Sequence, residues 1–231
     1  MNYHETDEQS NAQQESKTVG NLPKLSHGNS GPRPKRTPAA GRDLALIATF
    51  SALIAVCALL PSIAVAGIPT PITLQTFGVM LAGLVLGAKR GFLAVTLYLA
   101  VGAAGLPIFS GGKAGLSVFM GATVGYLIAF PIAAFFIGMV SQRLLAPVTT
   151  ARRSGGTYIA KLTLAIGTCL TISIFTIHAL GALGMAWRIP MEIPQAIIAD
   201  AIFLPGDIIK TTCAVLVAAA ILRAFPQLRS R

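Results

Sequence analysis

The sequence of 231 residues has little charge: Asp, Glu, Lys and Arg make up 11% of it, whereas 54% is hydrophobic. Soluble domains carry roughly 25% charged residues, so this chain lacks the polar side chains that would cover a surface exposed to water. The composition therefore excludes an ordinary soluble domain, a coiled coil and a disordered chain. Acidic residues are scarcest, because after residue 42 only Asp43, Glu192, Asp200 and Asp207 remain. An integral membrane protein is expected.

Several motifs of chemistry are also missing. The three cysteines lie in separate apolar runs, without the spacing of metal ligands or of a disulfide framework. The chain has no GxxxxGK[ST] loop, and its acids after residue 42 do not form the paired carboxylates of a metal-dependent transferase. Although the net charge is +10, the basic residues do not alternate with aromatic ones as in a nucleic-acid groove. We therefore expect no enzyme activity, no metal, no cofactor and no nucleic-acid partner.

The first 42 residues differ from the rest of the chain, because they are polar and rich in Gln, Asn, Ser, Pro and Gly. They contain no apolar core, which argues against a cleaved signal peptide. We interpret residues 1–42 as a disordered cytoplasmic tail. Binding of its basic end, residues 32–38, to anionic lipid headgroups is an alternative. A transmembrane domain is expected over residues 43–224, followed by a basic cytoplasmic tail over residues 225–231.

Apolar runs of spanning length predict the fold. They cover about residues 44–66, 74–88, 91–106, 117–140, 158–187 and 205–222, and the second and third are near the lower limit for a span. We start the last run at Pro205, since proline is tolerated in the first helical turn, and expect a short external helix around residues 195–203. One long interrupted helix over residues 195–222 is the alternative. The predicted fold is an all-α bundle of six transmembrane helices.

The basic residues fall mostly on one side of this bundle. With six spans, fifteen Lys and Arg lie in the N-terminal tail, at residues 89–90, over residues 141–161 and at the C-terminus, whereas only Lys113 and Arg188 lie on the other side. Cytoplasmic loops carry the excess of Lys and Arg. Both termini are therefore predicted to be cytoplasmic, in a multi-pass protein of the lipid bilayer of the cell (inner, cytoplasmic) membrane.

Asp207 and Lys210 are the most informative residues, because charged side chains inside a span usually face a protein interior or a cavity. At i,i+3 they point to one face of the last span. We interpret the pair as a binding site near the outer surface, where Lys210 meets the anionic end of a ligand. Asp207 then accepts hydrogen bonds from the ligand or holds Lys210 in place. An internal ion pair that only eases insertion is the alternative.

Two other segments are predicted on the same side. The sequence GGKAG at 111–115 has glycines that let the backbone approach a ligand closely, and its Lys113 could share a ligand with Lys210. The polar stretch at 69–76, which includes Gln75, lies at a span entrance and could form a lid. An ordinary flexible loop and a cap with a turn are the respective alternatives.

Three further features of the sequence concern Asp200, His178 and the first span. Asp200 is interpreted as a loop or capping residue, because a break at Pro205 would remove it from the face of Asp207. His178 is alone in the fifth span and is interpreted as a hydrogen-bonded packing residue. In the first span, small residues four apart, including Ala48 and Ala52, allow close helix approach; they predict either packing inside the bundle or docking to another membrane subunit.

Five short motifs, taken in order, resemble the BioY family. They are ITLQT (72–76), LYLA (97–100) with GLP (105–107), GGK (111–113), GYL (125–127) with FP (130–131), and PGDIIK (205–210). The resemblance runs from about residue 42 to residue 222, and the N-terminal tail lies outside it. Members of this family are the biotin-binding S components of energy-coupling factor (ECF) transporters.

The resemblance implies a six-helix bundle that binds biotin near the outer face, under a lid between the first two helices. It implies that Asp207 and Lys210 match the family's binding pair, that Lys113 and Gln75 close the pocket, and that Tyr126 is a further binding residue. It also implies a transmembrane coupling (T) subunit and two cytoplasmic ATPases, docked through Ala48 and Ala52. The rival interpretation is a membrane scaffold or assembly subunit with a purely structural Asp207–Lys210 pair.

Overall fold

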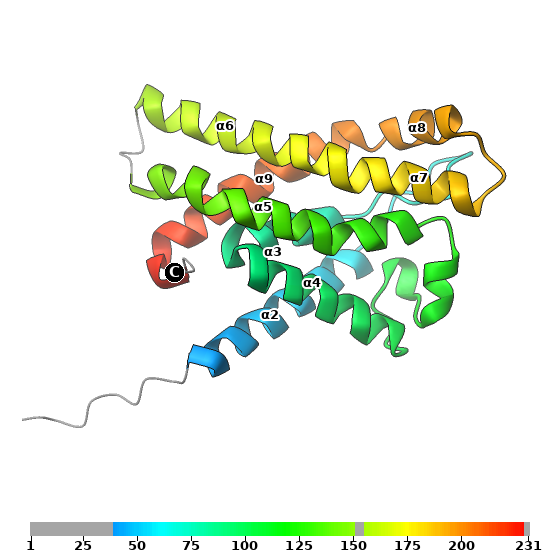
Figure 1. The fold of residues 1–231 in the computed structure, drawn as a ribbon, viewed down its shortest axis with the longest axis horizontal. Helices are drawn as coiled ribbons and strands as arrows, with labels where there is room; N and C mark the ends of the chain where they lie inside the picture. The colour runs from blue at the N-terminus through cyan, green and yellow to red at the C-terminus, as the bar shows by residue number, and fades with distance from the viewer. Residues whose placement is uncertain (1–38, 151–154, 229–231) are drawn as a thin grey trace, which may run out of the picture. The chain divides into compact units, whose positions relative to one another are not determined.

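The computed structural model describes residues 39–150 and 155–228, and the regular structure of these residues is helical (Figure 1). Two isolated β-bridges, between Ile63 and Ile72 and between Phe109 and Lys113, connect loop segments. The helices in chain order are α2 (Ala39–Leu59), α3 (Gln75–Leu86), α4 (Ala88–Ala103), η1 (Ser110–Gly112), η2 (Leu116–Met120), α5 (Val124–Thr150), α6 (Gly156–Ser173), η3 (Ile174–His178), α7 (Ala179–Arg188), α8 (Ile193–Ala201), α9 (Leu204–Ala224) and η4 (Pro226–Leu228).

Several helices are long and apolar enough to cross a membrane. Among the residues described, four segments meet both criteria, namely Ala40–Leu59, Val124–Leu145, Tyr158–Arg188 and Leu204–Ala224. The other two predicted spans correspond to α3 and α4, which have 12 and 16 residues. The prediction of an all-helical, multi-pass membrane fold is therefore confirmed in its general form, whereas the number of six spans and the side of the termini stay predictions.

The helix ends differ in part from the predicted bounds. Helix α2 starts at Ala39 and stops at Leu59, before Pro61, because proline cannot donate the next helical hydrogen bond. Its first residues belong to the predicted tail 1–42, of which residues 1–38 lie outside the described residues. Helix α5 begins at Val124 rather than at 117, since Gly121 has an extended backbone after the 3-10 turn η2. Within the predicted C-terminal tail, Pro226–Leu228 forms another short 3-10 turn.

The turn between α3 and α4 is also tighter than expected. A single residue, Gly87, separates the two helices, with φ 79° and ψ −178°. Side chains with a Cβ rarely adopt this conformation, which explains the glycine. The basic pair Lys89 and Arg90 therefore lies in the first turn of α4, not in a loop, and Arg90 forms an ion pair of 2.9 Å with Asp43 of α2.

The two ends of the bundle carry different features (Figure 1). The α3–α4 turn, the start of α2 and the end of α9 lie at one end, where Arg42 also donates to the carbonyl of Gln227. The loop segments 60–74, 104–123 and 189–192 lie at the other end, where Arg188 donates to the carbonyl of Met120 over 2.8 Å. The segments predicted to surround a ligand are thus gathered at one end.

Gly125 sets the distance between α5 and α7. A Cβ at this position would lie 2.0 Å from the carbonyl oxygen of Leu180 and 2.9 Å from the Cα of Gly184. These are backbone atoms that cannot rotate away, so the close approach requires glycine.

We expect Gly125→Ala to force the two helices apart and to lower the stability by about 1–3 kcal/mol, measured as a lower thermal midpoint of the purified protein. Gly167→Ala on α6 is the matched control, because a Cβ there meets nothing within 4 Å. Equal midpoints for the two variants would show that α5 and α7 do not pack this closely.

Candidate functional site

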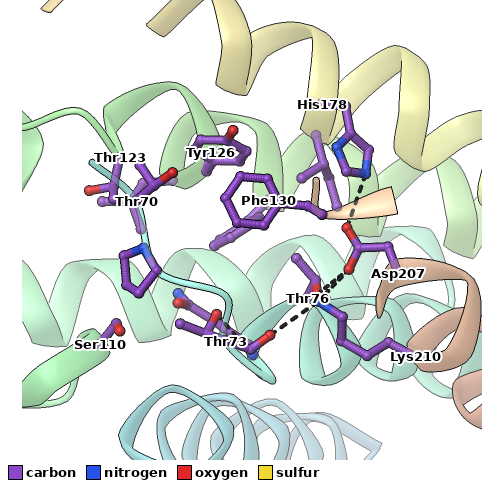
Figure 2. A pocket seen from close by; sticks show the side chains of 15 residues that line it. Thr70, Thr73, Thr76, Ser110, Thr123, Tyr126, Phe130, His178, Asp207 and Lys210 are labelled. Atoms are coloured by element: carbon purple, nitrogen blue, oxygen red, sulfur yellow. Dashed lines mark hydrogen bonds and ion pairs between the residues drawn. The ribbon is translucent and has the colours of Figure 1, made fainter. Parts of the chain in front are cut away.

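A cavity lies at the loop-bearing end of the bundle, between the segment 60–74 and helices α3, α5, η3 and α9 (Figure 2). It encloses about 530 Å³ of empty space, part of it open to solvent. The lining residues are Thr70, Pro71, Thr73, Gln75, Thr76, Ser110, Thr123, Tyr126, Leu127, Phe130, Ile177, His178, Phe203, Asp207 and Lys210.

Asp207 and Lys210 form an ion pair in the wall of this cavity. Their side chains are only 3% and 11% exposed, and the predicted i,i+3 contact is confirmed. Thr76 of α3 donates to the Oδ1 atom of Asp207 over 3.2 Å, and the Lys210 ammonium donates to the carbonyl of Thr73 over 3.1 Å. The pair therefore joins the first turns of α9 to the start of α3 and to the segment before it.

His178 and Asp200 belong to the same group of contacts, and the structure corrects the interpretation of Asp200. The Nδ1 atom of His178 lies 2.8 Å from the Oδ2 atom of Asp200, and its Nε2 atom lies 3.0 Å from the Oδ2 atom of Asp207. Tyr126 donates to the other oxygen of Asp200 over 2.5 Å. His178 is thus a cavity-lining residue between two acids, and Asp200 is a buried partner in α8 rather than a loop or capping residue.

A series of hydrogen bonds between polar groups holds the loop 104–115 beside the cavity. Gln75 donates to the hydroxyl of Tyr98 over 3.0 Å, and Tyr98 donates to the carbonyl of Ile108 over 3.3 Å. These bonds hold the loop that presents Ser110 to the cavity. The Oγ atom of Ser110 is buried and has no hydrogen-bond partner among the described residues. A buried hydroxyl without a partner is costly, so a ligand group could satisfy it.

Lys113 lies on this same loop but outside the cavity wall. Its carbonyl accepts from the amide of Phe109 over 3.1 Å, which closes the small turn η1 with Gly111 and Gly112 at φ 73° and 71°. Its side chain is exposed. Of the predicted binding residues, Gln75, Tyr126, Asp207 and Lys210 therefore line the cavity, and Lys113 lies three residues from one that does.

The segment between the first two helices, residues 60–74, is a compact hairpin. It contains residues 69–74 of the predicted lid, whereas Gln75 and Thr76 belong to the first turn of α3. Ile63 and Ile72 exchange two backbone hydrogen bonds of 2.9 Å each, and Gly67 adopts φ 79° in the turn between them. Thr70 is buried, with its hydroxyl 3.7 Å from the sulfur of Met185 in α7. Together with the bond from Lys210 to Thr73, these contacts hold the hairpin over the cavity.

The small-residue face of α2 lies elsewhere. Ala48 and Ala52 are exposed, whereas Ser51 of the neighbouring register is buried. The predicted docking residues are therefore accessible within this chain. In the part of the chain that the structure describes, no group of three or more His, Cys, Asp or Glu side chains could hold a metal ion.

Known proteins resemble this chain in both sequence and structure. Residues 29–227 match the model of the BioY family. The biotin transporter BioY of Rhizobium etli is 38% identical over 190 residues, which cover 82% of this chain and 98% of that protein. The biotin transporter BioY of Rhodobacter capsulatus is 39% identical over 196 residues, covering 80% and 95%. A crystal structure of the S-component for biotin from an ECF-type ABC transporter superposes with a TM-score of 0.69 at 29% identity, covering 80% of this chain and 94% of that one.

Proposed function

Because this chain belongs to the BioY family, we propose that it is the substrate-specific (S) component that binds biotin at the outer side of the cell membrane for ATP-driven uptake. The observation that carries the proposal is the Asp207–Lys210 pair, which faces a cavity under a hairpin. The work is binding rather than covalent chemistry. Closure of the hairpin over biotin would favour the state that delivers it inward.

The contacts of Lys210 favour one orientation of biotin. Its positive charge is already balanced by Asp207, so the two side chains present a donor and an acceptor side by side. The ureido ring of biotin offers the complementary set, with a carbonyl oxygen for Lys210 and an N–H for Asp207. This revises the role predicted for Lys210, which was to meet the carboxylate of the ligand.

The opposite end of the cavity then receives the carboxylate of biotin. Figure 2 shows Ser110, Thr70 and Thr123 at one side of the cavity and Asp207 and Lys210 at the other, with Phe130 between them. The hydroxyls supply donors to a carboxylate, and the apolar middle suits the rings and the alkyl chain. Lys113, on the exposed loop that follows Ser110, supplies the positive charge at this end.

The partners follow from what the chain lacks. Without a P-loop, the energy for uptake comes from other chains, and we assign these to a transmembrane coupling subunit and two cytoplasmic ATPases. The exposed alanines of α2 provide the docking face, because small residues allow helices to pack closely in a bilayer where the hydrophobic effect gives no drive for association.

Thermal unfolding with and without ligand tests the function. Biotin at about 100 times its Kd should stabilise the detergent-purified protein by about 2.7 kcal/mol and raise its thermal midpoint. Lipoate, a carboxylic acid of similar length without a ureido ring, is the matched control and should leave the midpoint unchanged. If biotin has no effect on folded protein, the Asp207–Lys210 pair is structural and the chain is a scaffold or assembly subunit.

A further inference from the structure

His178 connects two helices that do not continue into each other. Helix α8 ends at Ala201 and α9 starts at Leu204. Asp200, from the last turn of α8, and Asp207, from the first turn of α9, are both buried. The His178 ring lies between them, with one nitrogen on each carboxylate at 2.8 and 3.0 Å.

The backbone around His178 is itself irregular. Residues Ile174–His178 form a π-helical turn between α6 and α7, and such turns widen a helix and recur at functional sites. His178 is the last residue of this turn. The widened turn on one side and the break between α8 and α9 on the other therefore face each other, and the imidazole ring links them.

The charge of this group depends on the protons of the His178 ring. Ionised carboxylates only accept hydrogen bonds, so the hydrogen bond to Asp200 needs a hydrogen on Nδ1, and an ion pair with Asp207 needs a ring that is protonated on Nε2 as well. With the ring protonated, His178 and Lys210 balance Asp200 and Asp207, and the buried group is neutral. The Nε2–Asp207 contact is an ion pair without hydrogen-bond geometry, whereas Nδ1 is hydrogen-bonded to Asp200.

The two carboxylate oxygens of Asp207 contact different partners. Oδ2 faces His178, whereas Oδ1 receives the Thr76 hydroxyl and the Lys210 ammonium. A carboxylate with nothing on Oδ2 could rotate and take Oδ1 away from the ligand. On the far side of the ring, Tyr126 donates to Asp200 and fixes that carboxylate in turn.

We propose that His178 is a positioning residue for ligand recognition. Clamped by Asp200, it holds Asp207 in the rotamer that accepts the ureido N–H and ties α8 to α9 across their break. The proposal rests on the proposed function. Asp200 is not among the cavity-lining residues, so its effect on a ligand must pass through its neighbours.

The test compares biotin with an analogue whose ureido nitrogens are methylated, by calorimetry on the purified protein. The unchanged protein should bind biotin more tightly than the methylated analogue, because only biotin has a ureido N–H that can donate to Asp207. In His178→Gln and Asp200→Asn, we expect the affinity for biotin to fall about tenfold, the worth of one well-placed hydrogen bond to a charged group. The affinity for the methylated analogue should hardly change, so the ratio of the two affinities shrinks.

Thr176→Val is the matched control within the same π turn, because among the described residues the Thr176 hydroxyl bonds only to the carbonyl of Ile172, at 2.6 Å. Thr176→Val should keep the ratio of the affinities for biotin and for the methylated analogue. An equal loss for both ligands, or an unchanged ratio in the folded variants, overturns the positioning role. If His178→Gln does not fold, Asp200→Asn decides, since Asn matches the carboxylate in size and lacks only the negative charge that pairs with His178. Failure of the unchanged protein to bind biotin would instead overturn the proposed function.

Discussion

Lys210→Ala is expected to weaken biotin binding by about 10- to 100-fold, because the ureido carbonyl loses a hydrogen bond from a charged donor, which is worth roughly 1.5–3 kcal/mol. Two contacts are lost at once. The ureido carbonyl loses its donor, and the hairpin loses the bond from Lys210 to the carbonyl of Thr73. We therefore expect much of the lost affinity to result from faster dissociation of biotin, measured by release of labelled biotin.

The protein should still fold, because Asp207 keeps His178 and Thr76 as partners. The loss of stability should therefore remain below the 3–5 kcal/mol of a fully orphaned buried charge. Lys89→Ala is the matched control: Lys89 is an exposed residue in the first turn of α4, at the other end of the bundle, and should bind biotin normally. An unfolded Lys210→Ala protein would favour the purely structural pair.

A second ligand decides which end of biotin Lys210 contacts. Biotinamide keeps the ureido ring and lacks the carboxylate. If Lys210 contacts the ureido carbonyl, Lys210→Ala weakens biotin and biotinamide by the same factor. Lys113→Ala should instead weaken biotin alone. The reverse pattern would restore the role that the sequence first suggested for Lys210.

The sequence predicted the charged pair but not its neighbours. Asp207 and Lys210 are one helical turn apart, so local geometry alone puts them on one face. Asp200 and Asp207 are seven residues apart, and a break at Pro205 was expected to separate them. The break instead comes just before Leu204 and is short enough that both carboxylates still meet the same ring.

The partners of His178 were missed for a related reason. Its partners lie 22 and 29 positions further along the chain, on helices whose packing no periodicity reveals. A lone polar residue in an apolar run is ambiguous without that packing. Asp200, an acid in the apolar part of the chain without a predicted cationic partner, was a usable signal, because buried charges need partners and the sequence offers few cations there.

Loop conformation limited the prediction in the same way. Ser110 precedes the glycine-rich segment 111–115 and received no role from the sequence, and its place in the cavity depends on bonds made by Tyr98 and Gln75. The turn at Gly87 likewise moves Lys89 and Arg90 into a helix. Backbone conformations at glycine follow from tertiary contacts more than from local sequence.

Ala48→Leu is expected to leave biotin binding intact and to abolish most ATP-driven uptake when the coupling subunit and the ATPases are present. Ala48 is exposed on α2, far in sequence from the cavity-lining residues, so the larger side chain costs this chain little. In a docked complex it would hold two helices apart, because close packing there depends on small residues. Uptake of labelled biotin into proteoliposomes, set against binding to the same preparation, measures the separation of the two activities.

Ala160→Leu makes the same change on α6 and serves as the control. Ala160 is also exposed, so it tests whether any added bulk on the lipid-facing surface impairs uptake. We expect normal uptake for this variant. Normal uptake in Ala48→Leu as well would place the docking face on another helix, whereas loss in both variants would indicate a general effect of bulk. If only Ala48→Leu loses uptake and it still binds biotin, the chain binds biotin at one site and docks to the coupling subunit through a separate surface on α2.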